Sequence, residues 1–462
     1  MKVKLTGLSR RRFIGITGGV AAAFFASPFI ISEESKGAND RIGIGAIGVG
    51  GMGSGDTKSA ARFGNVVAIA DADLRHAEKL KSAFGGKPTT YQDYRKLLEN
   101  KNVDVIIQAT PDHWHTKINV ESLLAGKDVY GEKPITLTIN EGQILCEVVK
   151  KTKRIFQTGT MQRSDKKFQT AIELVRNGRI GKLKRVLVAL PYYSSWGGPF
   201  KAVAVPNELD WDLYQGQAPV QPYLPQRTHA IFRWWYEYAG GMVTDWGNHH
   251  MDIAHWGMDQ DYSGPLTVEG RGIFPNENKP DCFNTPDRFY AVLKYPNDVE
   301  LLFYTVMAEK PGFHGSIGHK ETTKEQFDWL FGKNCPQEVH DNKRNGIMFI
   351  GDKGRLFVNR GGLFGKPVEE LKENPLPENG WKVKPSNDHM KNFFDCVKSR
   401  EVPVASADLE HHSLTPCHLT NISIRLGGRK LQWDAAKEEI TNDKEANSML
   451  KREQRDKYRI EV

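Results

Sequence analysis

The stretch Arg41-Ile-Gly-Ile-Gly-Ala-Ile47, followed by Gly48-Val-Gly50-Gly-Met-Gly53, decides the fold. Its first part is typical of a short buried strand, and the glycines predict a tight turn into a helix that runs to about Phe63. A second apolar run, Val66 to Ala70, predicts the next strand and ends in Asp71. Strand, turn, helix and strand in this order predict a βαβ unit with a parallel sheet.

The spacing of the glycines matches G-x-G-x-x-G, which holds the pyrophosphate of a dinucleotide against a helix N-terminus. The first glycine permits the turn, the second lets the backbone approach the pyrophosphate, and the third lets the helix pack on the strand. Asp71 is placed to accept hydrogen bonds from the adenosine ribose. The predicted cofactor contacts in this unit are Gly48, Gly50, Gly51, Met52, Gly53 and Asp71.

NAD is the expected cofactor. The carboxylate of Asp71 would repel the 2′-phosphate of NADP, whereas Arg75 close by leaves NADP as the alternative.

The alternation of strands and helices continues through residues 40–160. Tyr91 to Glu99 looks helical, Val103 to Ala109 is typical of a buried strand, and Trp114 to Leu124 of an amphipathic helix. Asp128 to Tyr130 predicts another strand, and Thr138 to Glu141 is a capping box that opens a further helix. This pattern predicts a doubly wound parallel sheet of the Rossmann type. Ligands bind at the carboxyl ends of such strands, which is where the next candidate cofactor contacts fall: Thr110, Pro111, His115, Glu132 and Lys133.

Residues 1–36 resemble a twin-arginine export signal. Ser9-Arg10-Arg11-Arg12-Phe13 precedes a weakly apolar run from Ile16 to Ile31 that Gly18 and Gly19 interrupt. This run is short for a membrane span, which needs roughly 20 apolar residues. We therefore expect export to the periplasm, with the segment either removed or kept as an N-terminal membrane anchor.

Charge and cysteine content argue against two classes of protein, those that bind nucleic acids and those held together by disulfides. Of the formal charge of +8, residues 1–36 contribute +4 (six basic minus two acidic side chains), and the other +4 is spread without a basic block, so nothing calls for nucleic acid. The five cysteines are odd in number and widely spaced, which argues against a disulfide framework. A twin-arginine substrate folds in the reducing cytosol, and the cysteine pattern agrees with that route.

These motifs resemble the Gfo/Idh/MocA family of oxidoreductases. The resemblance rests on the glycine turn, on Thr110-Pro111 with His115, on Glu132-Lys133-Pro134, and on Asp245-x-x-x-His249 in the second half. Residues His389 to Arg400 and the tail from Leu431 to Asn447 are similar to the long C-terminal domain of an exported bacterial branch.

The resemblance implies a second, α/β domain over residues 161–450, with a large open mixed sheet that carries the substrate site. Residues 196–240, rich in Trp, Tyr, Pro and Gly, are interpreted as an insertion or rim over the pocket, because aromatic faces stack on sugars. A surface loop whose aromatics fill a satellite core is the competing interpretation. The substrate contacts suggested are Trp114, Trp196, Trp234 and His250.

By the same resemblance, Lys133, Asp245 and His249 converge on an alcohol to be oxidised. Hydride leaves to the nicotinamide while a base removes the hydroxyl proton. Either Lys133 or His249 is the acid/base, and Asp245 orients the pair. Pro134 is expected to follow a cis bond. We expect no metal, since on a helix only His249 and Asp252 share a face, which is too few ligands for a closed zinc site.

Three functional classes stay open. The first is an NAD(P)-dependent dehydrogenase that oxidises a ring hydroxyl of a sugar, glycoside or polyol with tightly bound, internally recycled cofactor. The second is a redox-assisted NAD-dependent glycosidase or lyase, which Lys133 disfavours because that branch lacks the lysine. The third is a non-catalytic ligand-binding relative, which should have lost the Lys/Asp/His set. The expected partner is a small sugar or glycoside, and the expected assembly is a homo-oligomer.

Overall fold

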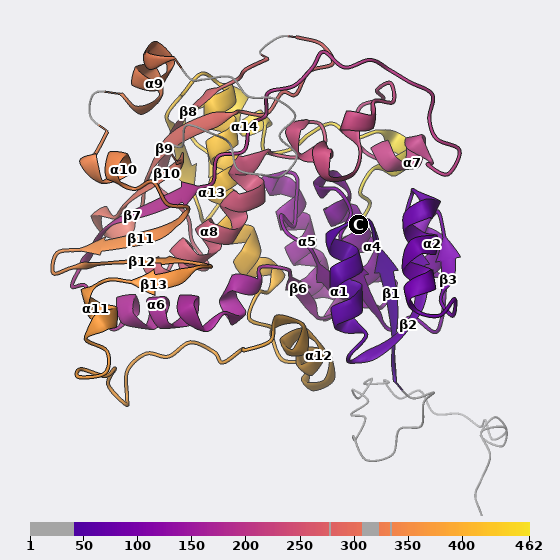
Figure 1. Cartoon of the computed structure of the whole chain (residues 1–462), viewed down its shortest axis with the longest axis horizontal. Helices are drawn as coiled ribbons and strands as arrows, with labels where there is room; N and C mark the ends of the chain where they lie inside the picture. Colours follow the sequence, from indigo (N-terminus) through magenta and orange to yellow (C-terminus); the bar gives the residue numbers. More distant parts are fainter. Residues whose placement is uncertain (1–40, 277–278, 307–322, 333–334) are drawn as a thin grey trace, which may run out of the picture. The chain divides into compact units, whose positions relative to one another are not determined.

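The glycine-rich strand β1 (Ile42–Ile47) lies inside a six-stranded parallel sheet with the order β3-β2-β1-β4-β5-β6 (Figure 1). The computed structural model describes residues 41–276, 279–306, 323–332 and 335–462, so the predicted export signal lies outside the described residues. The strand order reverses between β1 and β4, where the carboxyl ends of the strands form a ligand-binding crevice. The Rossmann prediction is confirmed. The other elements of this part are α1 (Met52–Ala60), β2 (Gly64–Ala70), α2 (Leu74–Ala83), β3 (Thr89–Tyr91), α3 (Tyr94–Leu98), β4 (Val105–Gln108), α4 (Asp112–Leu124), β5 (Asp128–Gly131), α5 (Ile139–Thr152) and β6 (Phe156–Thr158).

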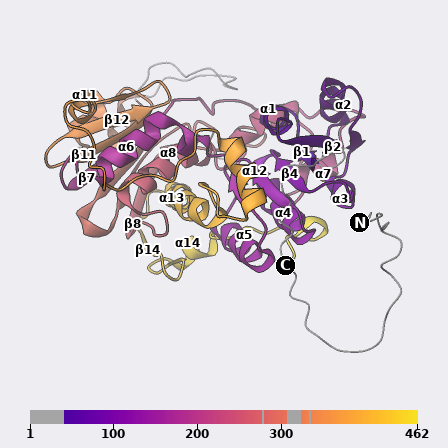
Figure 2. The same ribbon diagram turned by 90° about the horizontal axis from the view of Figure 1, so that it is seen from below.

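The central strand β4 is buried throughout, and all its residues except Gln108 are apolar, because both faces of the sheet are covered. Ile106 faces a core that includes Trp114 and Ile118 of α4. Val105 and Ile107 face the opposite core, which is completed by α12 (His389–Ser399) from the last third of the chain. Figure 2 shows α12 beside α1, far from it in sequence.

Two sequence expectations differ in detail from the structure. The segment expected to be one helix from Tyr91 to Glu99 is split into strand β3 and the short helix α3, because Asp93 caps the helix through its contact with the Arg95 N–H. The capping box of α5 is half formed. Thr138 Oγ1 accepts from the Glu141 N–H at 3.3 Å, but the Glu141 carboxylate accepts from the Leu137 N–H at 2.8 Å instead.

The second sheet is mixed and has nine strands in the order β13-β12-β11-β7-β10-β9-β8-β14-β15. β10 pairs with β7 in parallel, and every other pair is antiparallel. This is the large mixed sheet that the family resemblance implied. Its strands are β7 (Leu183–Leu190), β8 (Thr267–Ile273), β9 (Arg288–Lys294), β10 (Glu300–Thr305), β11 (Gly346–Gly351), β12 (Arg355–Asn359), β13 (Gly362–Phe364), β14 (Leu431–Asp434) and β15 (Glu439–Ile440).

Helices α8 (Met242–Met258) and α13 (Ala407–Arg425) join the two sheets. α8 packs on β7 of the second sheet, and α13 packs on α8, on β8 and on α5 of the first part (Figure 1). Both helices are almost wholly buried, although each also buries polar side chains, such as His249 in α8 and Glu410 in α13. Within the described ranges, no helix combines the length and apolar character needed to cross a membrane. The remaining helices are α6 (Lys166–Arg176), α7 (Trp211–Gln215), α9 (Lys324–Phe331), α10 (Gln337–Asp341), α11 (Lys366–Glu369) and α14 (Lys444–Ser448).

A buried arginine holds α8 in place. The Arg163 guanidinium lies 2.6 Å from the carboxylate of Asp252 in α8 and 2.8 Å from that of Asp261. The side chains of Arg163 and Asp252 are 3% and 0% exposed, so neither charge is compensated by water.

Arg163→Met should therefore lower the free energy of unfolding by about 3–5 kcal/mol, because it leaves a carboxyl group buried without its partner. Urea unfolding monitored by fluorescence measures the loss. The double variant Arg163→Met/Asp252→Leu should recover most of it, since two apolar groups replace the pair. Equal losses in the single and double variants would show that the ion pair is not what fixes α8.

Candidate active site

The glycine turn is packed tightly on the protein side and open on the other. Gly48 has φ +75°, and a Cβ there would lie 2.7 Å from the Thr110 nitrogen. A Cβ at Gly53 would lie 2.1 Å from the Gly48 carbonyl oxygen, so α1 approaches β1 as closely as backbone allows. Gly51, the N-cap of α1, has nothing within 4 Å of its Cβ position. The open side exposes the helix N-terminus and fits a pyrophosphate.

Asp71 supports this turn as well as lining the crevice. Its Oδ2 accepts from the Val49 N–H at 2.8 Å, and its Oδ1 accepts from the Asp73 N–H at 2.9 Å. His76 Nδ1 lies 3.5 Å from Oδ2, and this contact raises the pKa of His76. The carboxylate retains acceptor capacity for a ribose hydroxyl, since each oxygen has two lone pairs.

One cavity of about 440 Å³ joins the glycine turn to the second half of the chain. This volume is within the range of ligand pockets. Most residues predicted to touch cofactor line it: Gly48, Gly50, Gly51, Met52, Asp71, Thr110, Pro111, His115, Glu132 and Lys133. Asp245 and Trp114 line it too.

Lys133 and Asp245 meet at the far end of the cavity from Asp71. Lys133 follows β5, and the bond to Pro134 is cis, as predicted. Its Nζ donates to Asp245 Oδ1 at 2.6 Å, and Arg233 Nε lies 3.3 Å from the other oxygen. Burial would raise the pKa of Asp245, but the charges of Lys133 and Arg233 outweigh it and lower that pKa to about 2. Asp245 is therefore a carboxylate at neutral pH.

His249 lies one helical turn beyond Asp245 in α8 and is buried. Burial lowers the pKa of His249 well below its ordinary value, and the charges of Lys133 and Arg360 act in the same direction. The ring is therefore neutral. Its Nδ1 has no hydrogen-bond partner among the described residues, and the ring lies 5.8 Å from that of Trp246. The unused nitrogen can accept a hydrogen bond, but the lowered pKa makes the ring a weak base, and His249 is not among the residues that line the cavity.

Three further carboxyl groups, those of Asp112, Asp56 and Glu132, are buried in the region of Lys133 and Asp245. Their raised pKa values favour the neutral form, so they do little to offset the nearby positive charges. Burial raises the pKa of Asp112 to about 8 and that of Asp56 to about 7, and it raises the pKa of Glu132 well above its ordinary value. Glu132 Oε2 accepts from the Lys133 N–H at 3.3 Å. A Cβ at Gly159 would lie 1.9 Å from Glu132 Oε1, so the carboxyl group packs directly on backbone.

His115 ties together the two loops that carry these groups. Its Nδ1 lies 2.6 Å from the Pro134 carbonyl oxygen, and its Nε2 lies 2.7 Å from that of Thr110. Burial lowers the pKa of His115 to about 4, so the ring is neutral at pH 7. A neutral ring has one N–H, so it donates to one of the two loops at a time.

Part of the aromatic-rich stretch covers the adenosine end of the cavity. We call residues 208–233 the cover segment. Leu209 forms a bridge to Asp73, the Leu74 N–H donates to the Glu208 carbonyl at 3.0 Å, and Trp114 Nε1 donates to the Tyr214 carbonyl at 3.0 Å. Its α7 therefore lies beside the Rossmann part (Figure 1). Cover-segment residues that line the cavity are Leu213, Tyr214, His229, Ala230, Phe232 and Arg233.

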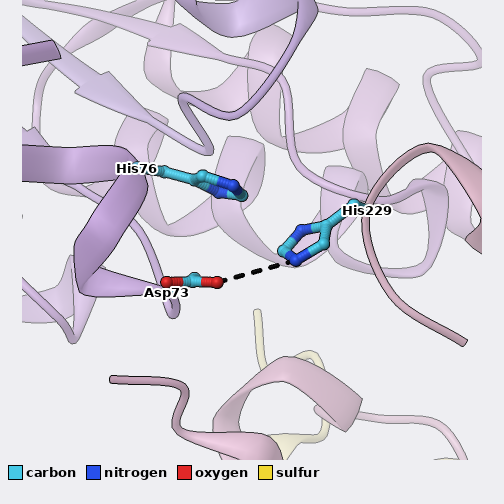
Figure 3. Close-up of side chains that lie close together, drawn as sticks. All are labelled: Asp73, His76 and His229. Atoms are coloured by element: carbon cyan, nitrogen blue, oxygen red, sulfur yellow. Dashed lines mark ion pairs between the residues drawn. The ribbon is translucent and has the colours of Figure 1, made fainter. Parts of the chain in front are cut away.

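At this covered end, His229 meets Asp73 and His76 (Figure 3). His229 Nε2 lies 3.6 Å from Asp73 Oδ2, and the two histidine rings are 4.6 Å apart. The three side chains are close enough to hold a metal ion. However, Arg75 already binds both oxygens of Asp73, at 2.8 and 2.6 Å. A cation would have to displace this guanidinium, so we interpret the cluster as a contact between the cover segment and the Rossmann part.

The structure does not bring every candidate to the cavity. Trp234 is 0% exposed in a satellite core with Trp235, Tyr238 and Phe283, as the competing interpretation of residues 196–240 anticipated. Trp196 does not line the cavity, and His250 Nε2 lies 2.6 Å from Asn345 Oδ1. Arg233, Tyr214 and His229 were missed, because nothing in their local sequence distinguishes them from the other polar and aromatic residues around them.

Comparison with known proteins identifies the family. Residues 42–160 match a family model described as an oxidoreductase family NAD-binding Rossmann fold. Residues 173–296 and 340–460 match the corresponding C-terminal alpha/beta domain. The chain belongs to the Gfo/Idh/MocA oxidoreductase family. The expected NAD-binding character and the two-part α/β fold are thereby confirmed.

The individual relatives are only moderately similar to this chain, and each matches over part of its length. Inositol 2-dehydrogenase from Salmonella paratyphi B is 26% identical over 200 residues, which are 40% of this chain and 59% of that protein. Glycosyl hydrolase family 109 protein 2 from Shewanella sp. (strain ANA-3) is 31% identical over 176 residues, 32% of this chain and 39% of that protein. The chain thus spans less than two thirds of the length of these relatives. The crystal structure of aldose-aldose oxidoreductase from Caulobacter crescentus, complexed with glycerol, has the same fold, with TM-score 0.59, 15% identity, and coverage of 85% of this chain and 99% of that one.

The neutral state of His249 can be tested through stability. The folded chain keeps the ring unprotonated, whereas the unfolded chain binds a proton below its ordinary pKa of 6.5. The folded state is therefore penalised as the pH falls below about 6.5, by up to about 1.4 kcal/mol per pH unit. We expect the free energy of unfolding of the wild type, minus that of His249→Gln, to be constant above this pH and to fall below it. Urea titrations over a pH series give both values, and a pH-independent difference would contradict the assignment.

Proposed function

We propose that this protein is an NAD-dependent dehydrogenase that oxidises a ring hydroxyl of a sugar, glycoside or polyol. One observation carries the proposal: the 2.6 Å pair of Lys133 and Asp245 closes the same cavity that begins at the glycine turn. An alcohol bound against Lys133 would lie at the end of the cavity away from Asp71, where the nicotinamide of a dinucleotide held by the glycine turn would reach. The names of the relatives, inositol 2-dehydrogenase and aldose-aldose oxidoreductase, support a polyol or sugar as substrate.

The charge state of each side chain indicates its role in the oxidation of the alcohol. Bound NAD supplies the hydride acceptor, and the protein must remove the hydroxyl proton. Lys133 lines the cavity and can contact the alcohol oxygen directly. Asp245 stays ionised and so orients Lys133 instead of exchanging protons at neutral pH. The Lys133 amine can therefore take the hydroxyl proton, and Asp245 then stabilises the ammonium group that forms. His249 is buried and does not line the cavity, and its lowered pKa makes it a weak base, so we assign it a positioning role beside the pair.

A redox-assisted glycosidase is the second candidate. It is favoured by the similarity to glycosyl hydrolase family 109 protein 2, and its first oxidation would use the same cavity. The two candidates differ in product. A dehydrogenase releases the intact keto-glycoside, whereas elimination breaks the glycosidic bond. Mass spectrometry of the products separates them.

Lys133→Met should abolish turnover, with a loss of at least about 10²–10⁴-fold, because removal of a positioned proton-transfer group costs that much. NAD content should stay unchanged, since the glycine turn and Asp71 hold the cofactor. Turnover of a sugar panel and the absorbance of extracted nicotinamide measure the two effects.

Lys184→Met, an exposed lysine on β7, is the matched control and should behave as the wild type. Asp245→Asn and His249→Ala should also lower turnover. An unchanged turnover rate in Lys133→Met would contradict the assignment of Lys133 as the proton-transfer residue.

We further propose export by the twin-arginine route with the cofactor already bound. The periplasm holds no useful pool of free nicotinamide, so the enzyme would load NAD in the cytosol and recycle it in place by returning the hydride to a second sugar or ketone. The cover segment supports slow release, since backbone hydrogen bonds tie it to the Rossmann part over the adenosine end. A homo-oligomer remains our expectation for the assembly.

Purified protein should therefore keep near-stoichiometric nicotinamide through gel filtration, and a single sugar should reduce it only once. His229→Ala, which removes the contacts with Asp73 and His76, should speed cofactor loss. Extraction and quantification of the nucleotide before and after filtration provide the measurement. Apo-protein that turns over steadily with added NAD would refute captive cofactor, and recovery from the cytosol of a host with a working export system would refute export.

A further inference from the structure

Positive charge gathers around the reacting end of the cavity. Lys133 and Arg233 each contact one oxygen of Asp245. A third cation, Arg360, stands in the turn between β12 and β13, and its charge acts on both Asp245 and His249. Three cations thus share one ionised carboxylate.

The turn holds Arg360 in a defined place. The Asn359 side chain accepts from the N–H groups of Gly361 and Gly362, at 2.9 and 3.0 Å. The Arg360 guanidinium stacks on Trp246, 4.7 Å from the ring centroid, and its Nε lies 3.2 Å from Gln162 Oε1. Gln162 in turn donates to the His249 carbonyl at 3.0 Å. Arg360 is therefore fixed beside the residues proposed to act on the alcohol.

The surroundings do not neutralise these cations. Among the residues that the structure describes, no carboxylate forms an ion pair with Arg360. Asp165, whose charge reaches it, is held 2.9 Å from Lys167. The carboxyl groups of Asp112 and Glu132 are buried and retain their protons at neutral pH. The nicotinamide ring of bound NAD would add a further positive charge.

Unbalanced charge of this kind attracts an anion. A planar guanidinium presents paired N–H donors that match the oxygens of a carboxylate or a sulfate. Arg233 is partly buried and lines the cavity, whereas Arg360 is exposed to solvent and does not line it. The charges of both arginines act on Asp245, which places them in the same region.

We propose that Arg233 and Arg360 form an oxyanion subsite, and that the substrate is an acidic sugar bearing a carboxylate or a sulfate. This inference rests on the proposed oxidation of a sugar, but the subsite makes its own prediction about binding. The alcohol would lie at Lys133, and the acidic group would lie between the two guanidinium groups.

The test uses the purified full-length protein with its bound cofactor. The probes are methyl glucuronide, methyl galacturonide and methyl mannuronide, each paired with its neutral methyl glycoside and with the 6-O-sulfate of that glycoside. Calorimetry gives affinities at low and high ionic strength, and nicotinamide absorbance reports oxidation. We expect at least one acidic probe to bind more than about tenfold more tightly than its neutral counterpart, which is typical of charged hydrogen bonds, and to weaken with salt.

Substitutions test whether the preference for the acidic probe depends on Arg233 and Arg360. Arg360→Gln and Arg233→Gln should each reduce the preference for the acidic probe, and Arg360→Lys should keep part of it because charge remains without the planar fork. Arg355→Gln, at an exposed arginine that begins strand β12 just before this turn, should leave the preference unchanged. Nicotinamide content, measured for every variant, separates a lost subsite from lost cofactor. Thermal unfolding confirms that each variant is folded.

The outcomes are distinct. A preference for sulfates over uronates, or the reverse, supports the subsite and identifies its oxyanion. Binding of an acidic probe that depends on the arginines but yields no reduced nicotinamide supports the subsite and contradicts the dehydrogenase. Equal or tighter binding of every neutral probe overturns the subsite, even if those sugars are oxidised. So does an acidic preference that survives both Arg360→Gln and Arg233→Gln.

Discussion

The ion pair between Lys133 and Asp245 depends on the docking of two separately built sheets. Lys133 stands at the end of a strand of the parallel sheet, and Asp245 stands in the first turn of a helix that packs on the mixed sheet. A contact of 2.6 Å tolerates little movement of one sheet against the other. The buried helices α8 and α13, the Arg163 ion pairs and the α12 contact with the first sheet all restrict that movement.

Charge in this region is unevenly distributed. Asp245 keeps its charge because two cations contact it, whereas Asp112 and Glu132, equally acidic in water, are held neutral by burial. His249 is neutral for the same reason. The region therefore combines fixed positive charge with uncharged side chains, which suits the recognition of an anion beside the reacting alcohol.

The sequence was most informative where function requires a local pattern. The glycine turn, the two strand-end groups (Thr110 to His115 and Glu132 to Pro134) and the Asp245/His249 spacing are each only a few residues long, so local pattern and family resemblance identified them together. The parallel, doubly wound character of the first sheet followed from the alternation of strands and helices, whereas the order of its strands came from the structure. Arg233, His229 and Arg360 could not be found in this way, because loops whose course is set by long-range packing bring them to the site. Trp234 shows the reverse, since an aromatic residue in a suggestive segment serves to fill a core.

The cover segment also bears on how the protein is assembled. Its partners Asp73 and Trp114 lie in the first third of the chain, so these contacts join residues that are far apart in sequence and form only after the long loops between them have closed. Most neighbouring strands of the Rossmann sheet, such as β1 and β2, pair over shorter connections. Under the proposed captive cofactor, NAD must enter before these long-range contacts close over the crevice. If the cofactor is loaded in this way, loading is a step in folding, and the amount of NAD in the compartment where the chain folds would set the yield of active protein.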